Sequence, residues 1–171
     1  MAGAGVNPAP FHDPARFPFV AELERHWQEI YAEFLAVQDA LGDYVEAQLY
    51  DHGWQVFGLW NLPHREPLTE GVLRCPRTAA LVEHLLPGHG AVAFSVLQPG
   101  ARIKPHQGKA GPYLRCHLAL EVPPGDCAIR VAAETRGWQE GRALVLDDRL
   151  EHEAWNLAAA RRVVLLLDFI A

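Results

Sequence analysis

The second half of the chain is a succession of short apolar segments, and this feature constrains the fold most. From residue 91 onward these segments alternate with turn signals such as Pro99-Gly100, Pro123-Pro124-Gly125 and Glu140-Gly141. Segments this short, bounded by Gly and Pro, are typical of β-strands rather than helices. The predicted strands span 91–97, 102–106, 113–122, 128–133, 142–146 and 162–169.

The first half has a different pattern. Between Pro18 and Leu41 the apolar residues recur at helical spacing, which predicts one amphipathic helix with Gly42 as its C-cap. A strand is predicted over Trp54–Trp60, and a second helix from Thr78 to Leu86. Helices followed by many short strands predict a mainly β fold, a sandwich or barrel with the N-terminal helices packed outside.

The length of 171 residues suits one domain with a substantial core. Residues 1–16 are rich in Ala, Gly and Pro and are expected to form a flexible arm, whereas 17–171 form a single domain. Within that domain, the part up to about residue 50 is expected to be helical and 54–170 to form the β core. The net charge of −6 argues against a nucleic-acid partner, because phosphate binding needs a clustered basic face.

Targeting signals and disulfide patterns are missing from the sequence. The three cysteines are odd in number and lack C-x-x-C spacing, so free thiols are expected. The N-terminus lacks the pattern of a signal peptide, and no stretch approaches the roughly 18 apolar residues of a spanning helix. We therefore expect a cytoplasmic protein with no membrane partner.

Two predicted strands carry polar residues that can do chemistry. In 113–121 the period of two puts Arg115 and His117 on the face opposite Leu114 and Cys116. That polar face either meets water or lines a barrel interior. Arg162 begins a strand that is apolar on both faces, so its guanidinium either reaches solvent along its stem or binds a ligand carboxylate.

Two histidines stand near the ends of predicted strands. His106 ends 102–106, and His152 follows 142–146 within the stretch DDRLEHEAWN. Nine histidines in one chain offer many such pairs, so position alone is weak support for a metal site. The carboxylates around His152 are candidates to orient its ring, or plain surface charge: Asp147, Asp148, Glu151 and Glu153.

Several ordered segments together resemble the aspartyl/asparaginyl β-hydroxylases, which are iron(II), 2-oxoglutarate-dependent oxygenases. The segments are Phe94-Ser95-Val96-Leu97-Gln98-Pro99-Gly100, Ile103-Lys104-Pro105-His106-Gln107-Gly108, Leu114-Arg115-Cys116-His117-Leu118-Ala119-Leu120, Trp138-Gln139-Glu140-Gly141, the stretch 147–156 and Arg162-Val163-Val164-Leu165-Leu166-Leu167-Asp168. The resemblance covers roughly residues 54 to 170. It implies a double-stranded β-helix, or cupin-like jelly roll.

The resemblance also implies a site and its cofactors. His106 and His152 would be the two Fe(II) ligands, Ser95 and Arg162 would hold the distal carboxylate of 2-oxoglutarate, and Arg115 with His117 would lie at its metal-proximal end. Imidazole suits Fe(II), and open positions admit the keto acid and O2. The cofactors carry the oxidative decarboxylation, while the protein orients and shields the reactants.

Three positions bear on the substrate and on the reaction. Most of the wider superfamily has a carboxylate two residues after the first histidine, where this chain has Gly108, as the hydroxylase family also does. A missing carboxylate is also how related halogenases admit a halide. Tyr113 and Arg149 depart from the family pattern near the substrate mouth.

The expected substrate is an amino-acid-type group, free, in a peptide or on a carrier, hydroxylated at the β-carbon of an aspartyl or asparaginyl unit. A lipid substrate is less expected. Cations available to bind an acidic substrate are Arg74, Arg77, Arg102, Lys104 and Lys109. The alternatives are a halogenase on the same scaffold and a non-catalytic cupin-like binding module, and the oligomeric state is not predicted.

Overall fold

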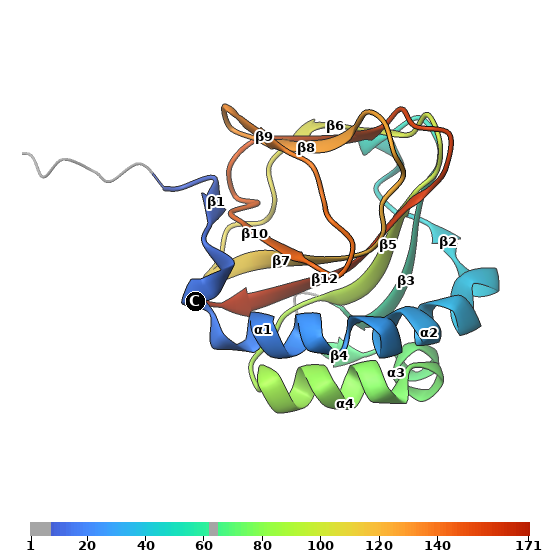
Figure 1. The fold of residues 1–171 in the computed structure, drawn as a ribbon, viewed down its shortest axis with the longest axis vertical. Helices are drawn as coiled ribbons and strands as arrows, with labels where there is room; N and C mark the ends of the chain where they lie inside the picture. Colours follow the sequence, from blue (N-terminus) through green and yellow to red (C-terminus); the bar gives the residue numbers. More distant parts are fainter. Residues whose placement is uncertain (1–7, 62–64) are drawn as a thin grey trace, which may run out of the picture.

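The computed structural model describes residues 8–61 and 65–171, which form two facing sheets and a layer of helices (Figure 1). The larger sheet contains β1 (Phe11–His12), β2 (Gly42–Asp43), β3 (Trp54–Asn61), β4 (Glu66–Pro67), β5 (Val92–Leu97), β7 (Tyr113–Glu121), β10 (Ala143–Leu146) and β12 (Arg162–Ile170). The smaller sheet contains β6 (Arg102–His106), β8 (Cys127–Val131), β9 (Glu134–Arg136) and β11 (His152–Asn156). The predicted mainly β, jelly-roll class is confirmed.

Strand order explains how the sheets enclose an interior. The larger sheet runs β1-β10-β7-β12-β5-β3-β2, with β4 paired to β3, and the smaller runs β6-β11-β8-β9. The apolar strand β12 lies between β5 and β7 and pairs antiparallel with both. Such a central strand is covered on both faces, which fits its nearly continuous burial.

Helices cover the outer face of the larger sheet (Figure 1). They are α1 (Pro18–Arg25), α2 (Trp27–Val37), α3 (Thr69–Arg74) and α4 (Pro76–Leu85). The single helix predicted over 18–41 is wrong, because the backbone leaves helical geometry at His26, and Gly42 begins β2 instead of capping a helix. Apolar spacing reports which face is buried, and it continues across this break. None of the helices in the described ranges is long and apolar enough to cross a membrane.

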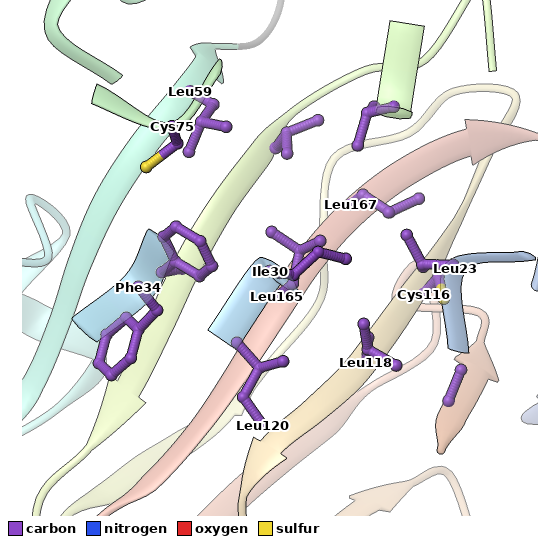
Figure 2. Packing of buried hydrophobic residues seen from close by; sticks show 14 of the residues in the cluster. Leu23, Ile30, Phe34, Leu59, Cys75, Cys116, Leu118, Leu120, Leu165 and Leu167 are labelled. Atoms are coloured by element: carbon purple, nitrogen blue, oxygen red, sulfur yellow. The ribbon is translucent and has the colours of Figure 1, made fainter. Parts of the chain in front are cut away.

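Two apolar cores lie on opposite faces of the larger sheet. Figure 2 shows the first, between the sheet and the helices, where Leu118 and Leu120 of β7 meet Ile30 and Phe34 of α2. The second lies between the two sheets and includes Ala119 of β7. The predicted two faces of β7 are therefore confirmed, and the polar face is the barrel interior.

The N-terminal expectation needs correction. Residues 1–7 lie outside the described part of the chain. Phe11 is buried and pairs with Leu146 of β10, and Asp13 caps the short 3-10 helix Pro14–Arg16 with its side chain. The arm expected over 1–16 is therefore ordered from Phe11 onward, because this segment extends the larger sheet.

The strand that contains His152, β11, was not predicted. His152 is the first residue of β11 rather than a residue after a strand. The inward residues of β11 are His152, Ala154 and Asn156, so the segment lacks the apolar alternation that marks a strand.

Candidate functional site

The two histidines come together at the edge of the smaller sheet. His106 and His152 are register partners on β6 and β11, with ring centroids 4.2 Å apart. The Nδ1 atom of His106 lies 2.7 Å from the Lys104 carbonyl oxygen, and that of His152 lies 2.9 Å from the Leu150 carbonyl oxygen. A neutral ring that donates from Nδ1 keeps its lone pair on Nε2. The pair therefore offers two Nε2 atoms to a metal.

Burial keeps His152 neutral. It lowers the pKa of His152 to about 4, although the Leu150 carbonyl acts in the opposite direction. A neutral imidazole is the form that binds metal. A backbone carbonyl, not a carboxylate, thus orients this ring, so the alternative in which a carboxylate supports it is wrong. The four candidate carboxylates pair elsewhere, Asp147 with Arg149, Asp148 with Arg115, and Glu151 and Glu153 with Arg130.

The carboxylate of Asp148 packs against Gly108, which stands two residues after His106. The Gly108 N–H donates to the Asp148 carbonyl oxygen at 2.7 Å, and a Cβ added at Gly108 would meet both the carboxylate and that carbonyl. In 8–61 and 65–171 no group of three or more His, Cys, Asp or Glu is arranged to hold a metal. The candidate ligands in the described ranges are therefore His106 and His152, and the carboxylate of Asp148 lies beside Gly108 on another segment.

Adding an acid ligand at Gly108 is expected to fail. In Gly108→Asp, the new Cβ would lie 2.7 Å from Cγ of Asp148 and 2.9 Å from its carbonyl oxygen. Such overpacking should lower the free energy of unfolding by about 1–3 kcal/mol, measured by chemical denaturation. Gly88→Asp is the control, since nothing lies within 4 Å of a Cβ at Gly88. A Gly108→Asp protein as stable as wild type would contradict this prediction.

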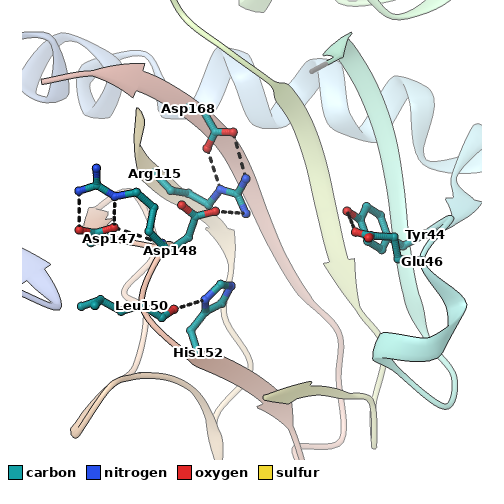
Figure 3. Close-up of polar contacts among 9 residues, drawn as sticks. Tyr44, Glu46, Arg115, Asp147, Asp148, Leu150, His152 and Asp168 are labelled. Carbon is teal, nitrogen blue, oxygen red and sulfur yellow. Dashed lines mark hydrogen bonds and ion pairs between the residues drawn. The ribbon is translucent and has the colours of Figure 1, made fainter. Parts of the chain in front are cut away.

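A compact ion-pair cluster lies near His152 (Figure 3). Arg115 donates from Nε and Nη2 to Asp168 at 2.7 and 3.0 Å, and its Nη1 lies 3.1 Å from Asp148. Burial alone would lower the pKa of Arg115, but these two carboxylates raise it overall. Burial raises the pKa of Asp148, and Arg115 opposes that rise. The cluster fixes Arg115 on the barrel interior and neutralises its charge.

Arg162 is a buried cation. It is 2% exposed, and Nη2 reaches the Ser95 Oγ at 3.3 Å and the Ser95 carbonyl at 3.4 Å. Among the described residues no carboxylate forms a salt bridge with it, and its Nε has no acceptor. Burial lowers its pKa to about 10, so it is still charged at neutral pH. The alternative that Arg162 reaches solvent is therefore wrong.

His117 also has a buried nitrogen without a hydrogen-bond partner among the described residues. Its Nδ1 accepts a hydrogen bond from the Trp138 indole at 3.3 Å, and its Nε2 has no partner in the described part of the chain. Burial is the main cause of its strongly lowered pKa, and the charges of Arg162, Arg115 and His152 add to it. His117 is therefore neutral at physiological pH.

This lowered pKa predicts a pH effect on stability. The unfolded chain binds a proton at His117 near its ordinary pKa of about 6.5, whereas the folded chain does not. Keeping His117 neutral therefore costs no folding free energy above about pH 6.5. As the pH falls below this value, the unfolded chain gains a proton at His117 and the free energy of unfolding decreases. Between pH 7 and pH 5 the unfolding free energy of wild type should fall more than that of His117→Gln, measured by denaturant titration. Equal losses would contradict the assignment.

Of the six predicted site residues, four are buried: Ser95, His117, His152 and Arg162. Arg115 is half-buried, and the half-buried ring of His106 lies against that of His152. Their roles stay predictions. Of the cations expected to bind an acidic substrate, Arg74 instead pairs with Glu70 in the helical layer, and Arg77 lies in the first turn of α4 in that layer. Arg149 holds Asp147 and donates to the Gly111 carbonyl in the loop after His106.

Sequence reasoning missed Asp168 and Trp138. Asp168 follows five apolar residues in the buried strand β12, and a buried carboxylate there is a signal of a paired cation. Trp138 belongs to the family segment Trp138-Gln139-Glu140-Gly141. Its contacts are with His117 of β7 and Arg162 of β12, which are distant in the sequence, so no local pattern indicates them.

Comparison with known proteins gives matches along most of the chain. Residues 24–171 match the family model described as Aspartyl/Asparaginyl beta-hydroxylase. Ornithine lipid ester-linked acyl 2-hydroxylase of Rhizobium tropici is 39% identical, over 96% of this chain and 61% of that protein. Aspartyl/asparaginyl beta-hydroxylase of Homo sapiens is 35% identical, over 96% of this chain and 23% of that protein. The chain thus spans less than two thirds of either relative.

A solved structure shares the fold. A Pseudomonas putida prolyl-4-hydroxylase superposes with a TM-score of 0.52 at 16% identity, covering 88% of this chain and 87% of that one. At this identity the similarity concerns the architecture alone.

Proposed function

Because the chain belongs to the aspartyl/asparaginyl β-hydroxylase family, we propose that it is an Fe(II)- and 2-oxoglutarate-dependent hydroxylase. His106 and His152 would hold the metal through their Nε2 atoms. Arg162 and Ser95 would bind the distal carboxylate of 2-oxoglutarate, with His117 and Arg115 near its other end. When bound, iron and the keto acid would activate O2, which is the oxidant: one oxygen atom goes into succinate as the keto acid loses CO2, and the other turns a C–H bond of the substrate into C–OH.

The uncompensated cation at Arg162 carries this proposal. A buried guanidinium without a carboxylate partner is costly, and such a cation is matched by an anionic ligand. The unpaired Nε of Arg162 and Nε2 of His117 are both buried nitrogens in the barrel interior. A dicarboxylic keto acid supplies oxygen acceptors at both ends. The donor set therefore fits 2-oxoglutarate.

The residues around these groups orient the ligand and exclude water. Trp54 donates its indole N–H to the Ser95 Oγ at 3.1 Å, so the hydroxyl is held as it faces Arg162. The carbonyls of Lys104 and Leu150 fix the rings of the two histidines. Apolar residues of the inner core close the space around them, which strengthens charge interactions there.

The two candidate substrates share one kind of C–H bond. The β-carbon of an aspartyl or asparaginyl side chain and carbon 2 of an acyl chain are both methylenes next to a carbonyl carbon. We propose that this chain hydroxylates such a methylene. The aspartyl- or asparaginyl-type substrate, free, peptide- or carrier-bound, is the first candidate.

An ester-linked acyl chain is the second candidate. The name of the Rhizobium tropici relative points to it, and the charges near the site also favour it. Arg115 is neutralised by Asp148 and Asp168, and Arg149 by Asp147, so these cations are already paired. A neutral ester carbonyl requires less positive charge than a free carboxylate does.

The position of Asp148 favours hydroxylation over halogenation. Halogenases of this superfamily use the space left by a missing acid for a halide. Here the Asp148 carboxylate packs against Gly108, and its negative charge repels an anion at that position. We therefore expect succinate formation that does not depend on chloride.

The function is tested by cofactor binding and turnover. Anaerobic addition of Fe(II) and 2-oxoglutarate should give a visible charge-transfer band, and admission of O2 with a substrate should give succinate. A wild-type protein with neither signal is the outcome expected of a non-catalytic binding module, and it would overturn the proposal. Chloride-dependent turnover with a chlorinated product would support the halogenase instead.

Substrate class is tested by comparing stimulated 2-oxoglutarate consumption. Aspartyl and asparaginyl peptides, the free amino acids, and N-acyl or O-acyl amphiphiles are added in parallel. Mass spectrometry should locate the added oxygen on the carbon next to a carbonyl. Oxygen on any other carbon would contradict the proposed bond type.

A further inference from the structure

The indole of Trp138 lies beside two residues of the site, and the proposed function assigns it no role. Trp138 lies between β9 and β10, is 7% exposed and belongs to the core between the sheets. Its loop is anchored where the Gly141 N–H donates to the Ala119 carbonyl at 2.9 Å. Gly141 has φ 76, a conformation that favours glycine. The indole contacts both His117 and Arg162.

The edge of the indole decides the tautomer of His117. Trp138 Nε1 lies 3.3 Å from Nδ1 of His117, with the two rings inclined by 24°. An indole nitrogen is only a donor, so Nδ1 must present its lone pair. The other tautomer would bring two N–H groups together. The proton of the neutral ring is therefore on Nε2, the atom without a protein partner in the described residues.

The face of the indole supports Arg162. The guanidinium carbon lies 4.6 Å from the ring centroid. A cation over an aromatic face is stabilised without donating its N–H groups to an oxygen acceptor, so these donors stay available. The ring thus compensates part of the cost of burying this charge, while Nε has no acceptor among the described residues.

We propose that Trp138 is a positioning residue that sets His117 as an Nε2–H donor and holds Arg162 as a cation available to one oxygen-rich anionic ligand. In the alternative tautomer, the lone pair of His117 Nε2 would face the anion and repel it. The identity of that ligand, 2-oxoglutarate, rests on the proposed function. The arrangement of donors rests on the contacts of Trp138 with His117 and Arg162.

The tautomer is tested without cofactor or turnover. In metal-free protein labelled with 15N-histidine, His117 should show an unprotonated Nδ1 and a protonated Nε2, assigned by the resonance lost in His117→Gln. In Trp138→Phe, which keeps an aromatic face but loses the N–H, both tautomers should appear. A protonated Nδ1 in wild type, or an unchanged His117 spectrum in Trp138→Phe, would overturn the proposal.

Ligand positioning is tested by steady-state kinetics. Trp138→Phe should raise the KM for 2-oxoglutarate about tenfold, the effect of one misaligned buried hydrogen bond, with kcat within about twofold. Trp60→Phe is the matched control, because Trp60 is equally buried and packs on His89 in the outer core. An unchanged KM in Trp138→Phe, or an equal rise in Trp60→Phe, would contradict a positioning role.

A second variant covers the case in which Trp138→Phe does not fold. Replacing Trp138 by benzothienylalanine keeps both rings and removes only the N–H, so it should reproduce the tautomer mixture and the higher KM. If wild type consumes no 2-oxoglutarate, the proposed function fails, but the 15N spectra still decide the role of Trp138. If turnover occurs and the tautomer is not set by Trp138, only the further inference fails.

Discussion

Replacing His152 by alanine should abolish Fe(II) binding and lower turnover by more than about a hundredfold. Loss of a residue that merely orients a ligand already costs about 10–100-fold, and here one of only two proposed ligands is lost. The other ligand, His106, cannot chelate alone. The charge-transfer band, titrated anaerobically with Fe(II) in the presence of 2-oxoglutarate, measures the effect. His106→Ala should behave in the same way.

Two controls separate metal loss from unfolding. His84→Ala removes an exposed histidine from α4 in the helical layer and should leave the band and the turnover unchanged. Circular dichroism should show the same strand content in His152→Ala as in wild type. A folded His152→Ala protein that keeps the wild-type band would exclude His152 as a ligand.

Replacing Arg162 by methionine should separate stability from function. The variant should bind 2-oxoglutarate more than about a hundredfold more weakly, because a buried charge-to-charge contact is lost. Without ligand, the free energy of unfolding of the variant should be about 1–4 kcal/mol higher than that of wild type. The reason is that an apolar side chain replaces a buried cation that has no carboxylate partner. Isothermal titration of the keto acid and urea denaturation measure the two effects.

Two comparisons make the Arg162 result specific. Arg25→Met changes an exposed arginine of α1 in the same way and should alter neither quantity measurably. Arg162→Lys keeps the charge but not the planar fork, so binding should be weakened less than in the methionine variant. If Arg162→Met is destabilised and still binds the keto acid tightly, then Arg162 has a structural role instead.

Local patterns were sufficient for the fold class and for the faces of single strands. The alternation in β7 correctly separated Arg115 and His117 from the leucines that meet the helices, because side chains along a strand point to opposite sides with a period of two. The apolar run of β12 correctly indicated a strand buried on both faces. The same patterns failed at His26 and in β11, where apolar spacing and backbone geometry do not coincide.

The candidate site was reached by motif resemblance rather than by physical patterns. The sequence placed His106 and His152 near strand ends but gave no reason for them to meet. Their register pairing comes from the antiparallel contact of β6 with β11. Similarly, the sequence leaves the carboxylates of DDRLEHEAWN as candidates to orient His152 or as plain surface charge, whereas Asp148 pairs with Arg115 of β7. Pairing between distant strands is set by how both sheets close, which no local window contains.

The sequence by itself therefore determined the class of the fold, the inward side chains of its central strands and, through its motifs, the family. Only the tertiary structure decided which charges are paired and which are not. Arg115 and Arg162 both lie on interior strand faces, yet one meets two carboxylates and the other meets Ser95 and the face of Trp138. Burial and long-range contacts fix the charge state and the partners of a side chain, and for this reason the free donors of the site appear only in three dimensions.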